Sequence, residues 1–143
     1  MTRRALVTGG SGAIGAAICR RLAADGCAVI VHANSRLDAA QKVAAEIGGA
    51  SAVAFDVTDA AATRAALEEL VEDEPIQVIV NNAGIHDDAP FPGMRREQWQ
   101  RVIDVSLNGF FNVTQPLVLP MIRTRWGRIV NVSSLAALAS LPA

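Results

Sequence analysis

The sequence predicts an α/β fold, a doubly wound parallel β-sheet of about five strands. Short apolar runs alternate with helical segments, the order expected of parallel β-α-β units. Several of these runs are continuously apolar, which is typical of strands covered on both faces. Apolar residues make up 51% and charged residues 19% of the 143 residues, so we expect one domain over residues 1–143.

The strands are predicted from the apolar runs and follow one another along the whole chain. They are expected at Arg4–Thr8, Cys27–His32, Ser51–Phe55, Ile76–Asn81 and Gly127–Ser133. The segments between them carry helical patterns. Helices are expected over Ala13–Ala24, from Ser35 to Ile47, from Thr58 or Asp59 to about Glu72, and over Arg95–Arg123.

Local signals refine these helices. Ile14, Ile18 and Leu22 recur at helical spacing and form one apolar face of the first helix. A serine or aspartate before a helix caps its free amides, and Ser35 is the predicted N-cap of the second helix. Pro116 and Pro120 are expected to kink the last helix or split its final turns, because proline lacks an amide hydrogen.

A glycine-rich turn joins the first predicted strand to the first predicted helix. Gly9 allows the chain to leave the strand sharply, the small Ala13 allows backbone to approach a pyrophosphate, and Gly15 allows close helix packing. Unpaired amides and the helix dipole attract an anion at this point. The turn therefore predicts dinucleotide binding in a Rossmann-like sheet. The residues predicted to hold the dinucleotide here are Gly9, Gly10, Ser11, Gly12, Ala13, Ile14 and Gly15.

Further motifs follow this turn in a characteristic order. They are Asp56-Val57 after the third strand, Asn81-Asn82-Ala83-Gly84 at the end of the fourth, Trp99 with Val102–Phe111, and the run from Gly127 to Ser134. Together with the Thr-Gly-x-x-x-small-x-Gly spacing, this set resembles the classical short-chain dehydrogenase/reductase family over the whole chain. The Asn-Asn-Ala-Gly-Ile and Trp-Gly-Arg-Ile runs are most similar to 3-oxoacyl-[acyl-carrier-protein] reductases.

The resemblance implies how a nicotinamide cofactor is held. Asp56 and Val57 match residues that contact the adenine ring, and Asn82, Ala83 and Gly84 match the segment that supports the nicotinamide ribose. Two alternatives stay open. Asp56 can instead cap a helix, and the asparagines can simply satisfy backbone groups at a strand end.

NADP is predicted over NAD from the end of the second strand. A carboxylate there grips the ribose hydroxyls of NAD and repels a 2′-phosphate, and none lies between Val31 and Arg36. Asn34, Ser35 and Arg36 can donate hydrogen bonds to a phosphate instead. Against NADP, Gly12 stands where many NADP-using relatives carry arginine. His32 is interpreted as a strand residue whose ring turns into a crevice.

The resemblance also implies a hydride transfer to a carbonyl, in which a tyrosine with a lysine four residues later supplies the proton. Ser134, preferred over Ser133, matches the serine that orients the carbonyl. Ser106 stands where the family has an asparagine that supports a relay water, and Asn108 is expected on the opposite helix face. The sequence contains no tyrosine and ends before the expected Tyr-x-x-x-Lys motif, so the isolated 143-residue chain is predicted to be inactive.

These observations leave three functional hypotheses. The first is NADP-dependent reduction of a small-molecule or carrier-bound 3-oxoacyl thioester to its 3-hydroxyacyl form, as in fatty-acid biosynthesis, by a homo-oligomer. The second is a nucleotide-binding fragment or subunit without catalysis. The third is a short-chain dehydrogenase of another alcohol, a sugar or a steroid.

Composition limits the other classes of function. A net charge of −1 argues against nucleic acid or an anionic membrane as the partner. No apolar stretch reaches the roughly 20 residues of a membrane helix. Cys19 and Cys27, both expected to be buried, indicate neither a metal site nor a disulfide and favour a cytoplasmic location. The resemblance also implies two further strands beyond the fifth, so the Rossmann-like sheet is expected to be incomplete at that edge. The isolated chain is therefore predicted to be marginally stable and to associate.

Overall fold

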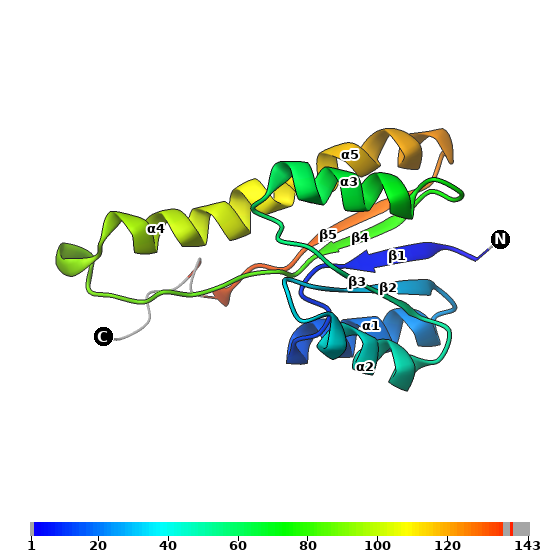
Figure 1. Cartoon of the computed structure of the whole chain (residues 1–143), viewed down its shortest axis with the longest axis horizontal. Helices are drawn as coiled ribbons and strands as arrows, with labels where there is room; N and C mark the ends of the chain where they lie inside the picture. Colours follow the sequence, from blue (N-terminus) through cyan, green and yellow to red (C-terminus); the bar gives the residue numbers. More distant parts are fainter. Residues whose placement is uncertain (1, 136–137, 139–143) are drawn as a thin grey trace.

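The computed structural model describes residues 2–135 and 138 and confirms the parallel α/β sheet. Its strands are β1 (Arg4–Val7), β2 (Ala28–Ala33), β3 (Ser51–Ala54), β4 (Val78–Asn81) and β5 (Arg128–Asn131). All neighbouring strands are parallel, in the order β3-β2-β1-β4-β5 (Figure 1). β2 and β3 follow one another outward on one side of β1, and β4 and β5 follow one another outward on its other side. The strand order therefore reverses between β1 and β4. Such a reversal opens a crevice at the carboxyl ends of the strands.

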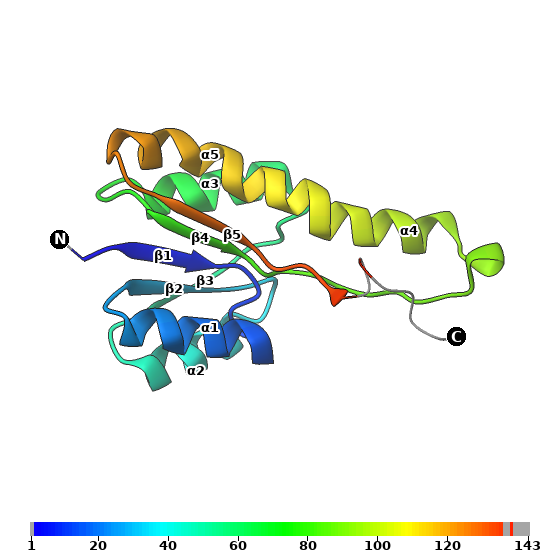
Figure 2. The same cartoon turned by 180° about the vertical axis from the view of Figure 1, so that it is seen from behind.

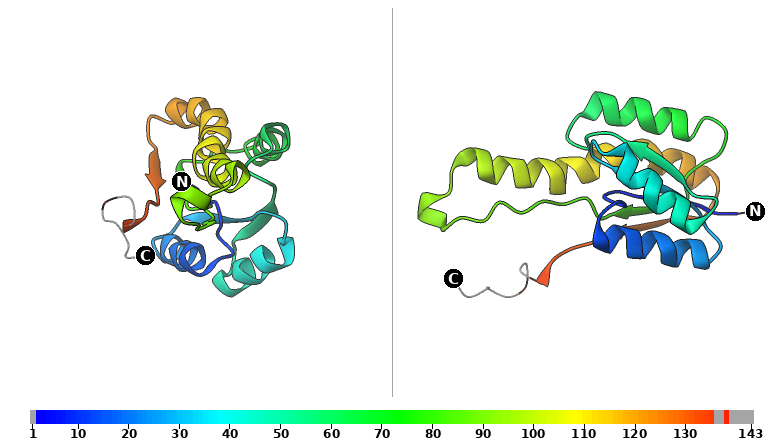
Figure 3. Two further views of the ribbon diagram at one scale, coloured as in Figure 1. Left: turned by 90° about the vertical axis from the view of Figure 1, so that its left-hand side faces the viewer. Right: turned by 60° about the horizontal axis from the view of Figure 1, so that its bottom comes forward.

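Helices cover both faces of this sheet. Seen from either side, α1 (Ala13–Ala24) and α2 (Leu37–Ile47) lie on one face, and α3 (Ala60–Leu70) and α5 (Gly109–Arg123) lie on the other (Figures 1 and 2). A short 3₁₀ turn (Phe91–Gly93) precedes α4 (Arg96–Ile103). Together with the segment that follows β4, α4 projects beyond the carboxyl ends of the strands (Figure 3).

Alternate strand residues enter two separate cores, which explains the continuous apolar runs. Towards α1 and α2 the partners are small. The buried helix residues on this side are Ala16, Cys19, Ala40, Val43 and Ala44. Towards α3 and α5 the partners are larger. On this side the buried residues from the helices are Leu67, Val113, Leu117 and Met121. The helices therefore pack against the two faces with side chains of different size.

Two expectations about helix ends and breaks are wrong. Ser35 does not cap α2, whose N-cap residue is Arg36, and no side-chain capping hydrogen bond is formed there. Pro116 and Pro120 lie inside α5 and do not split its final turns. The long helix is interrupted earlier, by a π-helical turn at Asp104–Asn108. A π-helical turn places an extra residue in the helical hydrogen-bond ladder and so interrupts the α-helix at this point.

The residues that helix α1 buries fully are small, whereas its long apolar side chains Ile18 and Leu22 pack against the core while only partly buried. Its buried residues are Gly15, Ala16 and Cys19, whereas Ile14 is 65% exposed. Burial raises the pKa of the Cys19 thiol to about 11, so this thiol stays protonated and packs as a small apolar group. Cys27 is only partly buried, which corrects the expectation for that residue.

The exposed apolar face of α1 borders a groove beside the edge strand β5. The groove has a volume of about 700 Å³, and Val78, Val80 and Val130 of β4 and β5 form its floor. Every residue of β5 is exposed, Val130 by 48%. Parallel strands are normally covered on both faces, so apolar surface of this kind favours association.

A protein consisting of residues 1–143 is therefore expected to self-associate at micromolar concentration, and Ile14→Lys with Val130→Thr should shift it towards monomer. Both side chains are exposed, so the substitutions cost little folding free energy. Sedimentation velocity measures the change, with Ala24→Lys, an exposed site outside the groove on the same helix, as the charge-matched control. A clean monomer with a sharp, concentration-independent unfolding transition would contradict the expectation.

Candidate cofactor site

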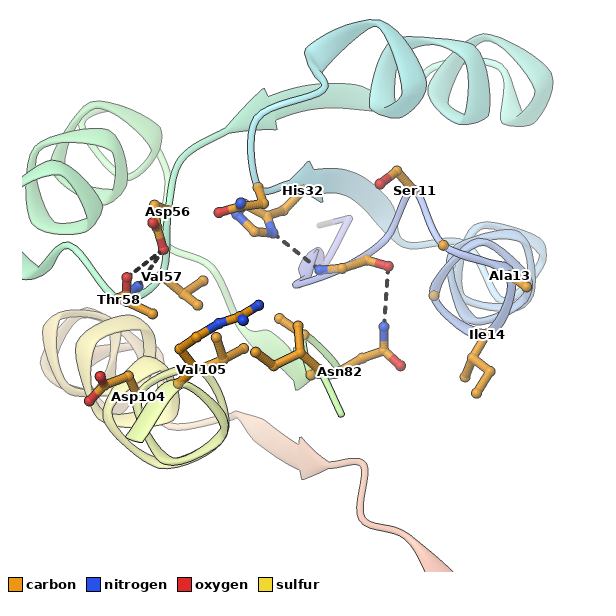
Figure 4. Close-up of a pocket in the computed structure, with 18 residues that line it drawn as sticks. Ser11, Ala13, Ile14, His32, Asp56, Val57, Thr58, Asn82, Asp104 and Val105 are labelled. Carbon is orange, nitrogen blue, oxygen red and sulfur yellow. Dashed lines mark hydrogen bonds between the residues drawn. The ribbon is translucent and has the colours of Figure 1, made fainter. Parts of the chain in front are cut away.

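A cavity of about 770 Å³ opens at the carboxyl ends of the strands, within the usual size range for small-molecule sites (Figure 4). Most residues predicted to hold the cofactor line it. From the glycine-rich turn these are Gly9, Ser11, Gly12, Ala13, Ile14 and Gly15. From the ends of β2, β3 and β4 they are Asn34, Asp56, Val57, Asn82, Ala83 and Gly84.

Five predicted site residues do not line this cavity. Gly10 lies beneath the turn, where a Cβ would come within 2.9 Å of the Val7 carbonyl oxygen. Ser35 and Arg36 follow Asn34 just outside, and Arg36 pairs with Asp38 at 3.0 Å on the surface. Ser106 is exposed in the π-helical turn, and Ser134 is exposed after β5. The catalytic roles of these two serines stay predictions.

The glycine-rich turn is shaped to leave room for an anion. Gly9 has φ +63°, a conformation that side-chain-bearing residues rarely adopt. A Cβ on Gly15 would overlap the carbonyl oxygen of Gly9, so this glycine packs against the turn itself. The N-cap residue of α1, Gly12, supplies no side-chain hydrogen bond. The first amides of α1 are thus left for a ligand, which fits the pyrophosphate of a dinucleotide.

Thr8, which the sequence prediction did not include in the site, connects the turn to the end of β4. It is 2% exposed, and its Oγ1 accepts hydrogen bonds from the amides of Asn82 and Ala83, both at 3.0 Å. The same hydroxyl donates to the carbonyl oxygen of Val80 at 3.3 Å. A polar residue at the end of a buried apolar strand was the available signal, because such a hydroxyl needs partners.

The two asparagines of the Asn-Asn-Ala-Gly segment have different partners. Asn82 donates from Nδ2 to the carbonyl oxygens of Thr8 at 3.0 Å and Gly9 at 3.2 Å. Asn81 donates from Nδ2 to Thr114 at 3.1 Å and to Asn131 at 3.0 Å, joining β4 to α5 and β5. Asn82 therefore holds the turn in place, and both side chains satisfy groups at the strand end.

Asp56 closes a local turn and does not cap α3. Its Oδ1 accepts from the amide and the hydroxyl of Thr58, at 2.9 and 2.7 Å. The helix cap is Asp59, whose carboxylate accepts from the amide of Ala62 at 3.0 Å. Asp56 faces the cavity beside Val57, where Figure 4 shows both side chains.

Arg101 of α4 and Asp104 of the π-helical turn add charges to the cavity that the sequence prediction missed. Arg101 donates to the carboxylate of Asp87 at 3.1 Å, and Gln98 donates to the same carboxylate at 2.8 Å. Asp87, in the loop after β4, is thereby tied to α4. No spacing in the sequence signals a pair formed between a loop and a helix.

Two further properties concern the part of the chain that the structure describes. Within residues 2–135 and 138 there is no group of three or more histidine, cysteine, aspartate or glutamate side chains able to hold a metal ion. Nor is any helix in these ranges long and apolar enough to cross a membrane.

Comparison with known proteins identifies the family. The model of the short chain dehydrogenase family matches residues 3–143, and the chain belongs to this family of NAD(P)-dependent oxidoreductases. It is 43% identical to an acetoacetyl-CoA reductase of Paracoccus denitrificans over 136 residues, which cover 94% of this chain and 56% of that protein. It is 40% identical to a 3-oxoacyl-[acyl-carrier-protein] reductase of Aggregatibacter actinomycetemcomitans, covering 96% of this chain and 60% of that protein.

Solved structures lead to the same family. A gluconate 5-dehydrogenase from Burkholderia cenocepacia, in complex with NADP and tartrate, matches with a TM-score of 0.89 and 34% identity. The match covers 98% of this chain and 56% of that one. The chain thus spans a little more than half the length of the relatives it matches.

Replacing Gly15 by alanine is expected to destabilise the protein by about 1–3 kcal/mol, because the new methyl group overlaps the carbonyl oxygen of Gly9. Urea unfolding measures the loss. Gly12→Ala is the comparison, since a Cβ there makes an ordinary 3.4 Å contact with the same oxygen, and it should cost only the loss of a favourable N-cap residue, at most about 1 kcal/mol. Equal effects of the two substitutions would show that the turn is not packed as described.

Proposed function

We propose that the protein is an NADP-dependent oxidoreductase that reduces a 3-oxoacyl thioester to the 3-hydroxyacyl form. One observation carries the proposal: the glycine-rich turn and the Asn-Asn-Ala-Gly segment meet around a single cavity at the strand ends. The similarity to reductases of acetoacetyl-CoA and of 3-oxoacyl-[acyl-carrier-protein] supports the substrate class.

The residues present fit a nicotinamide dinucleotide. The free amides at the start of α1 suit its pyrophosphate, Asp56 and Val57 would contact the adenine, and Asn82 to Gly84 would support the nicotinamide ribose. Asn34 lines the cavity, no carboxylate lies between Val31 and Arg36 in the sequence, and Ser35 and Arg36 follow Asn34 directly. This favours NADP, which the similar gluconate 5-dehydrogenase contains.

The reduced nicotinamide supplies the hydride in such a reaction. Ser134, after β5, would donate a hydrogen bond to the carbonyl oxygen and so stabilise the negative charge that develops there. Ser106, in the π-helical turn, would hold a water molecule for proton transfer. The proton-donating tyrosine of the family has no counterpart within these 143 residues.

Specific observations favour each of two alternatives. The likeness to gluconate 5-dehydrogenase favours a sugar or another alcohol as substrate. The glycine-rich turn and the Asn-Asn-Ala-Gly segment form a cofactor cavity by themselves, which favours a nucleotide-binding subunit without catalysis.

We further propose a cytoplasmic homo-oligomer that acts on a small-molecule or carrier-bound acyl group. Free cysteines suit a reducing compartment. Large apolar side chains are exposed along α4, the π-helical turn and α5, as expected of a subunit interface. They are Trp99, Leu107, Phe111, Leu119 and Ile122.

The purified full-length protein is expected to oxidise NADPH in the presence of acetoacetyl-CoA or a 3-oxoacyl-carrier protein. Ser134→Ala should lower kcat by about 10²–10³-fold, because the carbonyl oxygen loses a donor, and leave the Kd for NADPH unchanged. Turnover with gluconate alone would favour the sugar alternative. Binding of NADPH without turnover of any substrate would favour the non-catalytic subunit.

Reversing the charge at Arg36 should weaken NADPH binding by about tenfold and leave NADH binding nearly unchanged, since only NADPH carries the 2′-phosphate. Arg36→Glu is compared with Arg21→Glu by titration calorimetry. Arg21 is also exposed and paired with a nearby aspartate, Asp25, but lies in the last turn of α1, at the opposite end from the glycine-rich turn. Equal losses for both cofactors would exclude a contact between Arg36 and the 2′-phosphate.

A further inference from the structure

His32, at the carboxyl end of β2, is held in one protonation state by its two partners. It is 1% exposed, its Nδ1 lies 3.1 Å from the amide nitrogen of Gly9, and its Nε2 lies 2.8 Å from the carbonyl oxygen of Phe55. An amide can only donate and a carbonyl oxygen can only accept. The ring must therefore be neutral, with Nδ1 bare and the proton on Nε2. Figure 4 shows this ring reaching from β2 to the glycine-rich turn.

The peptide groups on both sides of Gly9 depend on such contacts. Its amide donates to His32, and its carbonyl oxygen accepts from Gly12 at 3.1 Å and from Asn82 at 3.2 Å. Gly9 also has the positive φ that turns the chain towards α1. His32 is thus the partner that orients the first amide of the turn, whereas both of its own nitrogens are occupied and cannot contact the cofactor.

We propose that His32 is a positioning residue for the cofactor site: its neutral ring ties Gly9 to the end of β3, and protonation of Nδ1 releases the turn and weakens cofactor binding. The proposal rests on the proposed NADP-binding function. A proton on Nδ1 would place an N–H group against the amide of Gly9, so the hydrogen bond is lost and the two donors repel each other.

The surroundings of His32 set the direction of the pH dependence. Burial lowers the pKa of His32 from its ordinary value of 6.5, while the Phe55 carbonyl and the negative charge of Asp56 oppose this. The charged groups that line the same cavity are Asp56, Arg101 and Asp104. With a depressed pKa the folded protein favours the neutral ring. The contribution of His32 to stability is therefore complete above pH 6.5 and is lost as the pH falls through that value and below it.

The link itself is tested without cofactor, by ¹⁵N NMR of the imidazole nitrogens and of the Gly9 amide in the full-length protein. At about pH 8 we expect a bare Nδ1 and a protonated Nε2, and the Gly9 amide should shift with the titration of His32. The opposite tautomer, or a Gly9 amide that does not follow this titration, would overturn the proposal. Because no cofactor is present, the result is independent of the proposed function.

The consequence is tested by the Kd for NADPH between about pH 8 and about pH 5, which should rise by about tenfold, as for one lost hydrogen bond. His32→Asn places an amide oxygen near Nδ1 and cannot titrate, so it should keep tight binding and lose the His32 part of the pH dependence. His32→Leu should bind weakly at every pH. His86→Gln removes the other histidine, which is exposed, and should behave like the unchanged protein.

Comparison between variants removes the titration of the cofactor, whose 2′-phosphate changes charge near about pH 6 in every sample. Identical pH profiles for His32→Asn and the unchanged protein would overturn the positioning role and leave His32 as a core residue. Absence of NADPH binding at about pH 8 would instead overturn the proposed function, and the NMR result would still decide the link between His32 and Gly9.

Discussion

The buried hydroxyl of Thr8 is the contact on which the cofactor site depends. It accepts hydrogen bonds from the backbone amides of Asn82 and Ala83. These bonds join the end of β1 to the end of β4, where the strand order reverses. Asn82 returns two hydrogen bonds to the carbonyl oxygens of Thr8 and Gly9. The crevice at the strand ends therefore has walls held to each other by hydrogen bonds with little exposure to solvent, which favours a preformed site.

Much of the fold could be predicted because the signals are local. The apolar runs locate the five strands to within a few residues, and α1 begins and ends where its pattern predicts. The errors arise where tertiary packing decides. The small residues Gly15, Ala16 and Cys19 are buried and Ile14 is exposed, because packing against the sheet decides which face of α1 is covered. The π-helical turn at Asp104–Asn108 contains no proline or glycine that would have signalled an interruption of the helix.

The candidate site was predictable where backbone geometry requires particular residues. Gly9 has a positive φ, and Gly15 lies directly against the carbonyl oxygen of Gly9. Both constraints select glycine. Thr8, His32 and Arg101 were not assigned to the site. Their roles come from partners distant in sequence, at Asn82, Phe55 and Asp87 respectively. The spacing of residues along a chain carries no information about such pairs until the strands are placed side by side.

The unequal side-chain sizes on the two faces of the sheet have a consequence for how the protein can change over evolutionary time. Under α1 and α2, where alanine and cysteine fill the contacts, any enlargement forces the helices away from the sheet. Under α3 and α5, leucine, valine and methionine can be exchanged for residues of similar volume at smaller cost. Sequence drift should therefore be slow on the side that carries the glycine-rich turn and faster on the opposite side.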